Sequence, residues 1–238
     1  MKLRVLDLFS GIGGFSLGLE RAGGFETVAF CEIEPYSQKV LAKHWPGVPI
    51  YDDVRELTAK RLVADGIGVD VITGGFPCQP YSTAGKRGGA NDDRALWPEM
   101  LRLIQECRPA YVIGENVPGI INMGLDDVLS DLEGIGYTAG PVAIPACAVE
   151  RDQWRERIWI LAHTLPGVGQ VGRDASGGWG ESKQIPWHGM GKAKTPPRVV
   201  GGFDGIPGGL DRIRALGNAV VPQIPEIIGR AILEHRRR

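Results

Sequence analysis

The first 162 residues alternate apolar segments typical of buried strands with amphipathic segments typical of helices. This alternation limits the fold more than any other feature of the sequence. Strands are predicted over residues 3–9, 27–31, 69–73, 111–114 and 157–162. Helices are predicted over residues 14–22, 36–44, 94–107 and 125–135. This order predicts an α/β fold in which a mainly parallel, doubly wound sheet has helices on both faces.

The composition changes after this region. Residues 163–210 contain 13 Gly and 5 Pro, with Trp179, Trp187 and Phe203 scattered among them, and they show no clear period. We expect a small, loop-rich subdomain there. A last amphipathic helix, carrying Ile224 and Ile228, is expected to pack back on the large domain. The predicted division is therefore 1–162 plus 211–238 for the large domain and 163–210 for the small one.

Composition excludes several other classes of protein. Hydrophobic residues make up 43% and charged residues 23% of the 238 residues, which is ordinary for a soluble globular chain. No apolar run reaches the length of a membrane span, and the N-terminus has no signal-peptide pattern. The four cysteines form no Cys-x-x-Cys pair, and the four histidines are far apart. We expect a cytoplasmic protein with no metal and no membrane contact.

The charges are unevenly distributed. Residues 1–162 carry 16 Lys and Arg against 22 Asp and Glu, whereas residues 163–238 carry 11 against 6. The basic excess in the second segment is compatible with a polyanion that docks on one side of the molecule.

The first strand leads into a glycine-rich turn, Ser10-Gly11-Ile12-Gly13-Gly14, which opens a helix. Glycines allow a tight turn and a close approach of a ligand to the backbone. Ser16 stands where a dinucleotide motif has its third glycine, which argues against a pyrophosphate. Glu32 follows the second strand at the distance expected of a ribose-binding acid. A nucleoside without pyrophosphate, such as S-adenosylmethionine, fits both observations; the alternative is a turn that only packs tightly.

Residues 74–82 read Gly-Gly-Phe-Pro-Cys-Gln-Pro-Tyr-Ser and directly follow a predicted strand. The carboxyl ends of strands in open α/β sheets are where ligands bind. Most free cysteines are buried and inert, and Cys31, Cys107 and Cys147 fit that description. Cys78 lies among Gly, Pro, Gln and Ser, which cannot form a core, and we therefore predict that it is a nucleophile.

Three further polar residues come close to predicted strands. Glu115 directly follows the strand over 111–114, at the position of a ligand crevice. Arg155 and Arg157 alternate on an extended segment, so both can project to the same side. The alternatives are a surface salt-bridge acid for Glu115 and an exposed edge strand for the two arginines.

Taken in this order, the motifs resemble those of the DNA (cytosine-5) methyltransferases, through most of residues 3–162 and again through 211–232. The turn over 7–14 is similar to the family's cofactor loop, Glu115-Asn116-Val117 to its Glu-Asn-Val, and Gly217-Asn218-Ala219-Val220 to its Gly-Asn-x-Val. Pro77-Cys78-Gln79 and Gln153-Trp154-Arg155-Glu156-Arg157 are similar to its catalytic motifs. The resemblance implies S-adenosylmethionine as cofactor. The implied cofactor-binding residues are Phe9, Gly11, Gly13, Gly14, Glu32, Ile33, Asp53, Val54, Pro77, Asn218 and Val220, with Asp53 and Val54 at the adenine.

The resemblance also implies the chemistry. The thiolate of Cys78 would add to carbon-6 of a flipped-out cytosine, because the resulting enamine makes carbon-5 reactive toward a methyl group. A protonated Glu115 would bind ring nitrogen-3 and the exocyclic amine, and Arg155 and Arg157 would hold the carbonyl oxygen. The partner would be duplex DNA, and we expect a monomer encoded by a bacterium or a phage. The implied DNA contacts are Gln79, Ser82, Lys86, Arg87 and Arg94.

Part of the pattern departs from the family. The segment between Arg157 and Gly217 is short, and no Arg-rich element leads into Gly217. Target recognition is expected within 163–210, but neither the target sequence nor a cognate restriction endonuclease is evident. The alternatives are an RNA methyltransferase, a nicotinamide or flavin oxidoreductase on the same sheet, and a DNA-binding protein without catalysis.

Overall fold

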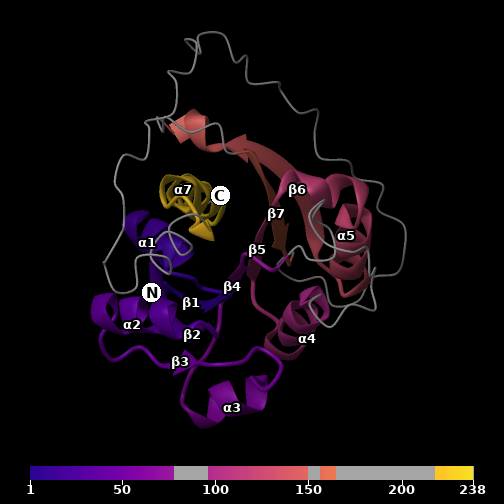
Figure 1. Cartoon of the computed structure of the whole chain (residues 1–238). Coiled ribbons are helices and arrows are strands. Elements are labelled where there is room, and N and C mark those ends of the chain that lie inside the picture. The colour runs from indigo at the N-terminus through magenta and orange to yellow at the C-terminus, as the bar shows by residue number, and fades with distance from the viewer. Residues whose placement is uncertain (78–95, 150–155, 165–217, 238) are drawn as a thin grey trace, which may run out of the picture.

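The computed structural model describes residues 1–77, 96–149, 156–164 and 218–237. Within these ranges seven strands form one sheet in the order β3-β2-β1-β4-β5-β7-β6 (Figure 1). The strands are β1 (Leu3–Leu8), β2 (Phe25–Cys31), β3 (Ile50–Tyr51), β4 (Val71–Gly74), β5 (Tyr111–Asn116), β6 (Thr138–Pro145) and β7 (Glu156–His163). All neighbours from β3 to β5 are parallel, whereas β7 runs antiparallel to both β5 and β6.

Six α-helices accompany the sheet in the described ranges. They are α1 (Gly14–Arg21), α2 (Pro35–His44), α3 (Ala59–Ala64), α4 (Trp97–Cys107), α5 (Leu125–Gly134) and α7 (Gln223–His235). Two short 3-10 helices, η2 (Pro118–Asn122) and η3 (Ala146–Val149), complete the connections. None of the helices in these ranges has the length and apolar character of a membrane span.

The predicted α/β class with a mainly parallel sheet is confirmed, but two strands and one α-helix of the described ranges were not predicted. The edge strand β6 has the sequence Thr-Ala-Gly-Pro-Val-Ala-Ile-Pro, and most of its residues are exposed or half-buried. It therefore lacks the apolar run on which strand prediction depends. Strand β3 is two residues long and α3 six, which is too short for a periodic signal.

The alternation of side chains along β1 explains why helices cover both faces. Leu3 and Val5 pack with the side chains of α1 and α7, whereas Leu6 and Leu8 pack with those of α4 and α5. Successive side chains of a strand point to opposite faces, so a strand buried on both sides reads as a continuous apolar run. Figure 1 shows the two groups of helices on opposite sides of the sheet.

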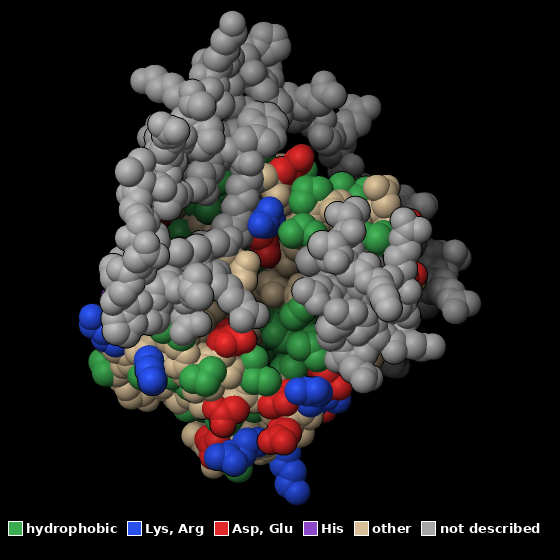
Figure 2. Space-filling model, in the orientation of Figure 1, with side chains coloured by type: hydrophobic (Ala, Val, Ile, Leu, Met, Phe, Trp, Pro, Cys, Tyr) green, Lys and Arg blue, Asp and Glu red, His purple; other side chains and the backbone are tan. Residues whose placement is uncertain are grey.

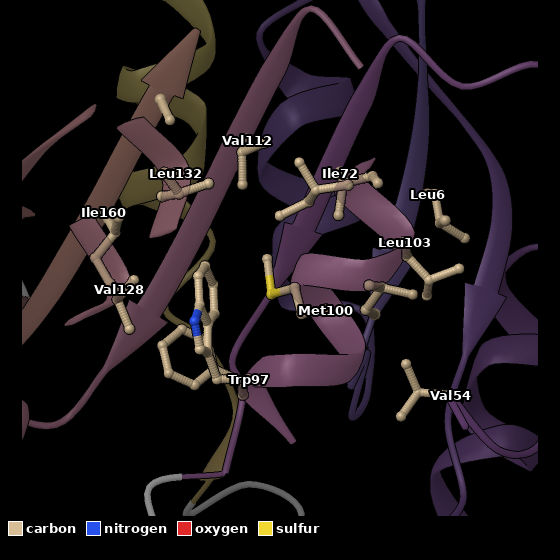
Figure 3. Close-up of a cluster of buried hydrophobic side chains, with 14 of the residues drawn as sticks. Leu6, Val54, Ile72, Trp97, Met100, Leu103, Val112, Val128, Leu132 and Ile160 are labelled. Atoms are coloured by element: carbon tan, nitrogen blue, oxygen red, sulfur yellow. The ribbon is translucent and has the colours of Figure 1, made fainter. Parts of the chain in front are cut away.

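Helix α4 contributes much of the core on its face of the sheet. Met100 and Leu103 are fully buried and lie against Ile72 of β4 and Val112 of β5 (Figure 3). Burying each such side chain stabilises the fold by about 1.5–3 kcal/mol. Trp97, at the start of α4, packs on the ring of Phe76 with 5.1 Å between the centroids. The helix is therefore anchored directly beside the end of β4.

On the other face, the C-terminal helix lies against the first helix. A Cβ atom built on Gly18 of α1 would be 2.2 Å from the carbonyl oxygen of Pro222 and 2.8 Å from Cβ of Pro225. The two helices approach this closely because position 18 has no side chain. The residues from 218 onward thus return to the N-terminal part of the sheet. The predicted small subdomain over 163–210 lies outside the described residues, apart from 163 and 164, and the division into domains stays a prediction.

The topology determines where a ligand can bind. The chain proceeds from β1 to β2 on one side, while β4 pairs with β1 on the other. The loops after β1 and β4 therefore diverge, and a crevice opens between them at the carboxyl ends of the strands.

Candidate active site

A cavity of about 260 Å³ lies at the carboxyl ends of the parallel strands. Its wall comes from the residues that follow β1, β2, β3 and β4 and from the residue that precedes α4. The lining residues are Phe9, Cys31, Glu32, Ile33, Glu34, Asp52, Asp53, Val54, Arg55, Pro77 and Leu96. Figure 2 shows the molecule hollowed near the centre of this view, with hydrophobic side chains in the hollow and acidic and basic side chains gathered below it.

The glycine-rich turn after β1 combines one open position with one crowded position. A Cβ atom built on Gly11 would have no other atom within 4 Å, whereas one on Gly13 would be 2.6 Å from the ring of Trp45. Both glycines have positive φ, at 52° and 85°. Phe9 also has φ of 51°, which is strained for a bulky residue, and its side chain lines the cavity. The turn thus packs on Trp45 and leaves open space beside the Cα atom of Gly11.

Glu32 is buried, and two backbone groups hold its carboxylate. The N–H of Gly11 donates to Oε2 at 2.6 Å, and the N–H of Glu34 donates to Oε1 at 2.8 Å. A carboxylate oxygen can accept more than one hydrogen bond, so both oxygens keep capacity for ligand hydroxyls. Glu32 therefore joins the glycine turn to the end of β2 and presents a fixed acceptor at the cavity.

Asp53 also lines the cavity and is paired with Arg55. The guanidinium donates to both carboxylate oxygens, and the shortest contact, from Nη2 to Oδ2, is 2.7 Å. This hydrogen bonding lowers the pKa of Asp53 below its usual value. The neighbouring Val54 side chain is buried in the core, which fixes the backbone at this wall.

The buried carboxyl group of Asp7 lies beneath the glycine turn, and no sequence pattern assigned it a separate role. Oδ2 of Asp7 accepts a hydrogen bond from the hydroxyl of Ser16 at 2.7 Å, and Oδ1 accepts one from Thr73 at 2.9 Å. Burial raises the pKa of Asp7 to about 7, although both hydroxyls oppose that shift. Asp7 ties β1 to the first turn of α1 and to β4, the strand that leads to Pro77.

A second polar cluster lies at the end of β5. Nε of Arg157 on β7 is 2.9 Å from Oε1 of Glu115, and both side chains are mostly buried. A Cβ atom built on Gly75 would be 3.3 Å from Oε2 of Glu115. The ion pair of Glu115 and Arg157 therefore lies beside the chain that leaves β4. The alternative of an exposed edge strand for Arg157 is wrong, because β7 is flanked by β5 and β6.

The structure places the predicted site residues unevenly. Six of the predicted cofactor residues line the cavity: Phe9, Glu32, Ile33, Asp53, Val54 and Pro77. Gly14 lies against the C-terminal segment, since a Cβ atom built on it would be 2.5 Å from the carbonyl oxygen of Val220. Asn218, two residues before Val220, is exposed. The predicted residues that lie outside the described ranges are Cys78, Gln79, Ser82, Lys86, Arg87, Arg94 and Arg155.

Several cavity residues were not predicted. Cys31 was interpreted as inert core and is buried, with its pKa raised to about 12 by burial, yet it also lines the cavity. Leu96, which directly precedes α4, lines it through a tertiary contact with no local signal. Arg55 lines it as well and directly follows the predicted Val54. Glu34 and Asp52 are neighbours in sequence of predicted residues, and that adjacency was the available signal. Among the described side chains no group of three or more could hold a metal ion.

Comparisons with known proteins agree with this geometry. The family model described as C-5 cytosine-specific DNA methylase matches residues 3–166. The Type II methyltransferase M.HgiBI of Herpetosiphon aurantiacus is 36% identical over 67% of this chain and 37% of its own length. M.AquIA, a Type II methyltransferase of Picosynechococcus, is 28% identical over 84% of this chain and 87% of its own length. The chain spans less than half the length of several curated relatives that it matches.

Solved structures show the same architecture. The crystal structure of Schizosaccharomyces pombe Dnmt2 methyltransferase superimposes with a TM-score of 0.59 and 25% sequence identity. The match covers 71% of this chain and 53% of that one. It agrees with the α/β fold described above.

Proposed function

This chain belongs to the C-5 cytosine-specific DNA methylase family, and we propose that it transfers a methyl group from S-adenosylmethionine to carbon-5 of cytosine in duplex DNA. The position of Pro77 is the observation that carries the proposal. Pro77 lines the cavity and directly precedes Cys78 in the chain. The predicted nucleophile is therefore attached to the wall of the predicted cofactor cavity, and the pair of Glu115 and Arg157 lies beside the same stretch of chain.

The residues of the cavity fit an adenosyl compound. Glu32 offers carboxylate oxygens for ribose hydroxyls, and the free space at Gly11 allows a ligand to approach the backbone. Asp53 and Val54 would hold the adenine, and Phe9 and Ile33 add apolar wall. When bound, S-adenosylmethionine supplies an electrophilic methyl group. Gly13, Gly14, Asn218 and Val220 would complete the site from the turn and from the C-terminal segment.

In this proposal the target base binds beside the end of β5. The thiolate of Cys78 adds to carbon-6, which converts the ring into an enamine. Glu115 would donate a proton to ring nitrogen-3 and accept from the exocyclic amine, and Arg155 and Arg157 would hold the carbonyl oxygen. Because Arg157 already contacts Oε1 of Glu115, a bound cytosine has to share or displace that contact.

The remaining parts of the proposal concern the polymer. A duplex hides its bases, so the cytosine has to be flipped into the site. Gln79, Ser82, Lys86, Arg87 and Arg94 would contact DNA, and residues within 163–210 would read the sequence. We propose a monomer that acts in a restriction-modification setting, as the names of the Type II relatives imply for those proteins.

A covalent trap tests the proposal directly. The purified chain is incubated with S-adenosylmethionine and a library of duplex oligonucleotides that carry 5-fluorocytosine. In this base, fluorine replaces the carbon-5 hydrogen that has to leave as a proton before the thiolate is eliminated from carbon-6. We expect a denaturant-resistant conjugate with the wild-type chain and none with Cys78→Ser. Transfer RNA that carries 5-fluorocytosine serves as the second arm. A conjugate with RNA alone would replace the DNA proposal by the RNA alternative, and a conjugate of the Cys78→Ser variant would overturn the role of Cys78.

A further inference from the structure

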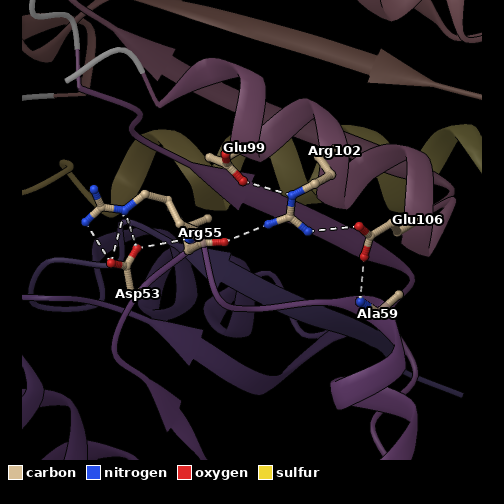
Figure 4. A network of polar contacts seen from close by, with 7 residues as sticks. Asp53, Arg55, Ala59, Glu99, Arg102 and Glu106 are labelled. Carbon is tan, nitrogen blue, oxygen red and sulfur yellow. Dashed lines mark hydrogen bonds and ion pairs between the residues drawn. The ribbon is translucent and has the colours of Figure 1, made fainter. Parts of the chain in front are cut away.

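Arg102 of α4 connects its helix to the wall of the cavity. Its Nη2 donates to the carbonyl oxygen of Val54 at 2.8 Å, its Nε contacts Glu99 at 2.8 Å, and its Nη1 contacts Glu106 at 2.9 Å (Figure 4). The side chain is 29% exposed. The planar fork of a guanidinium can satisfy three acceptors at once in a fixed geometry, whereas an ammonium carries its three donors on a freely rotating point charge. Arg102 is thus held by two carboxylates and, in turn, holds one backbone carbonyl.

Glu106 makes a second connection from the same helix. Its Oε2 accepts a hydrogen bond from the N–H of Ala59 at 2.8 Å, at the start of α3. The segment between β3 and α3 is therefore attached to α4 at both ends, at Val54 through Arg102 and at Ala59 through Glu106. This segment also supplies Asp53, Val54 and Arg55 to the cavity wall.

The contact at Val54 is the one that bears on the ligand. The carbonyl that Arg102 holds belongs to a residue of the cavity wall, and the adjacent carboxylate of Asp53 is less than one-quarter exposed. Holding that carbonyl fixes the peptide plane between Val54 and Arg55, directly after the two residues that would recognise the adenine. Arg102 itself does not line the cavity, so any effect on the ligand passes through the backbone of Val54.

We propose that Arg102 is a positioning residue for the adenosyl group: through the carbonyl of Val54 it sets the placement of Asp53 and Val54, and thereby the affinity and base selectivity of the cavity. This inference rests on the proposed function, because it takes the cavity to be the adenosyl site. The competing explanation is that the network only fastens α4 to α3.

The experiment compares variants of the full chain by calorimetric binding of S-adenosylhomocysteine. Arg102→Met removes all three contacts and keeps the apolar stem, and Arg102→Lys keeps the charge without the fork. Arg230→Met is the matched control. Arg230 also pairs with a glutamate on its own helix, Glu226 of α7, but it does not line the cavity. We expect Kd to rise about tenfold or more in Arg102→Met, to rise less in Arg102→Lys and to stay unchanged in the control.

The preference for the adenosyl over the inosyl compound distinguishes a positioning role of Arg102 from a general loosening of the fold. S-inosylhomocysteine lacks the exocyclic amine that Asp53 would accept from, so the wild-type chain should prefer the adenosyl compound. We expect Arg102→Met and Arg102→Lys to reduce that preference, while kcat at saturating cofactor stays within about twofold of wild type because Arg102 does not line the cavity. Should Arg102→Met fail to fold, Arg102→Lys still provides both readouts.

The outcomes distinguish the two hypotheses. Wild-type affinity and wild-type selectivity in the Arg102 variants would overturn the positioning role and leave the proposed function intact. Equal weakening of both ligands would assign Arg102 a merely structural role and also overturn it. If the wild-type chain binds no S-adenosylhomocysteine, the proposed function and this inference both fail.

Discussion

The side-chain amide of Asn116 donates a hydrogen bond to the carbonyl oxygen of Phe76 at 3.1 Å, between the end of β5 and the chain that leaves β4. Its Oδ1 accepts from the N–H of Val117 at 2.9 Å. The amide is buried, and these two hydrogen bonds give both of its polar atoms a partner inside the protein. Asn116 thus fixes the position of Glu115 relative to the two residues that precede Cys78.

Replacing Asn116 by Asp should damage this connection while keeping the shape of the side chain. A carboxylate oxygen would then face the carbonyl oxygen of Phe76, and a buried acceptor would lose its donor. We expect the free energy of unfolding in urea to fall by about 1–3 kcal/mol and methyl transfer to fall as well. Full activity together with wild-type stability would contradict this role for Asn116.

Glu32→Gln should weaken binding of the cofactor. The glutamine places an NH₂ group where a carboxylate oxygen now accepts from the N–H of Gly11 or Glu34. We expect Kd for S-adenosylhomocysteine, measured by calorimetry, to rise about tenfold or more. Glu26→Gln, at an exposed position of β2, the strand that precedes Glu32, is the control and should bind like wild type. A Glu32→Gln variant with the affinity of the control would exclude Glu32 from the site.

Two glycines in helices should respond oppositely to alanine. Gly18→Ala puts a methyl group 2.2 Å from the carbonyl oxygen of Pro222, so α1 and α7 have to separate, and we expect a loss of about 1–3 kcal/mol of stability. A Cβ atom on Gly134, at the end of α5, would meet nothing within 4 Å. Gly134→Ala should therefore leave stability unchanged or raise it by about 0.5–1 kcal/mol. Thermal unfolding of both variants measures the contrast, and similar Tm values would refute it.

Stability should depend on pH through Asp7. Its pKa rises from 3.8 to about 7 on folding because of burial. Below about pH 4 both states are protonated and the contribution is complete. Between about pH 4 and 7 the unfolded state loses the proton first, so stability declines with rising pH. We expect the urea-unfolding free energy of the wild type, relative to Asp7→Asn, to be larger at pH 5 than at pH 7.5. A difference that stays constant over this range would show that Asp7 does not titrate as inferred.

Much of the candidate site could be predicted because its residues follow strands directly in the sequence. Phe9, Glu32 and Pro77 each come one to three residues after a strand, and parallel strands end at the same edge of a sheet. Contacts between elements left no such local signal. The bond from Arg102 to Val54 joins residues 48 apart, and nothing in either neighbourhood announces it.

Hydrophobic periodicity, glycine positions and the order of the motifs determined the α/β class, the parallel part of the sheet and the strand ends at which the site would form. These signals are local, since they depend on backbone conformation and on which side chains avoid water. Only the tertiary structure decided that β7 lies inside the sheet, that Arg157 reaches Glu115 and that Asp7 is buried beneath the glycine turn. Such relationships depend on which elements pack together, and the energy of that packing comes from contacts between residues far apart in the chain.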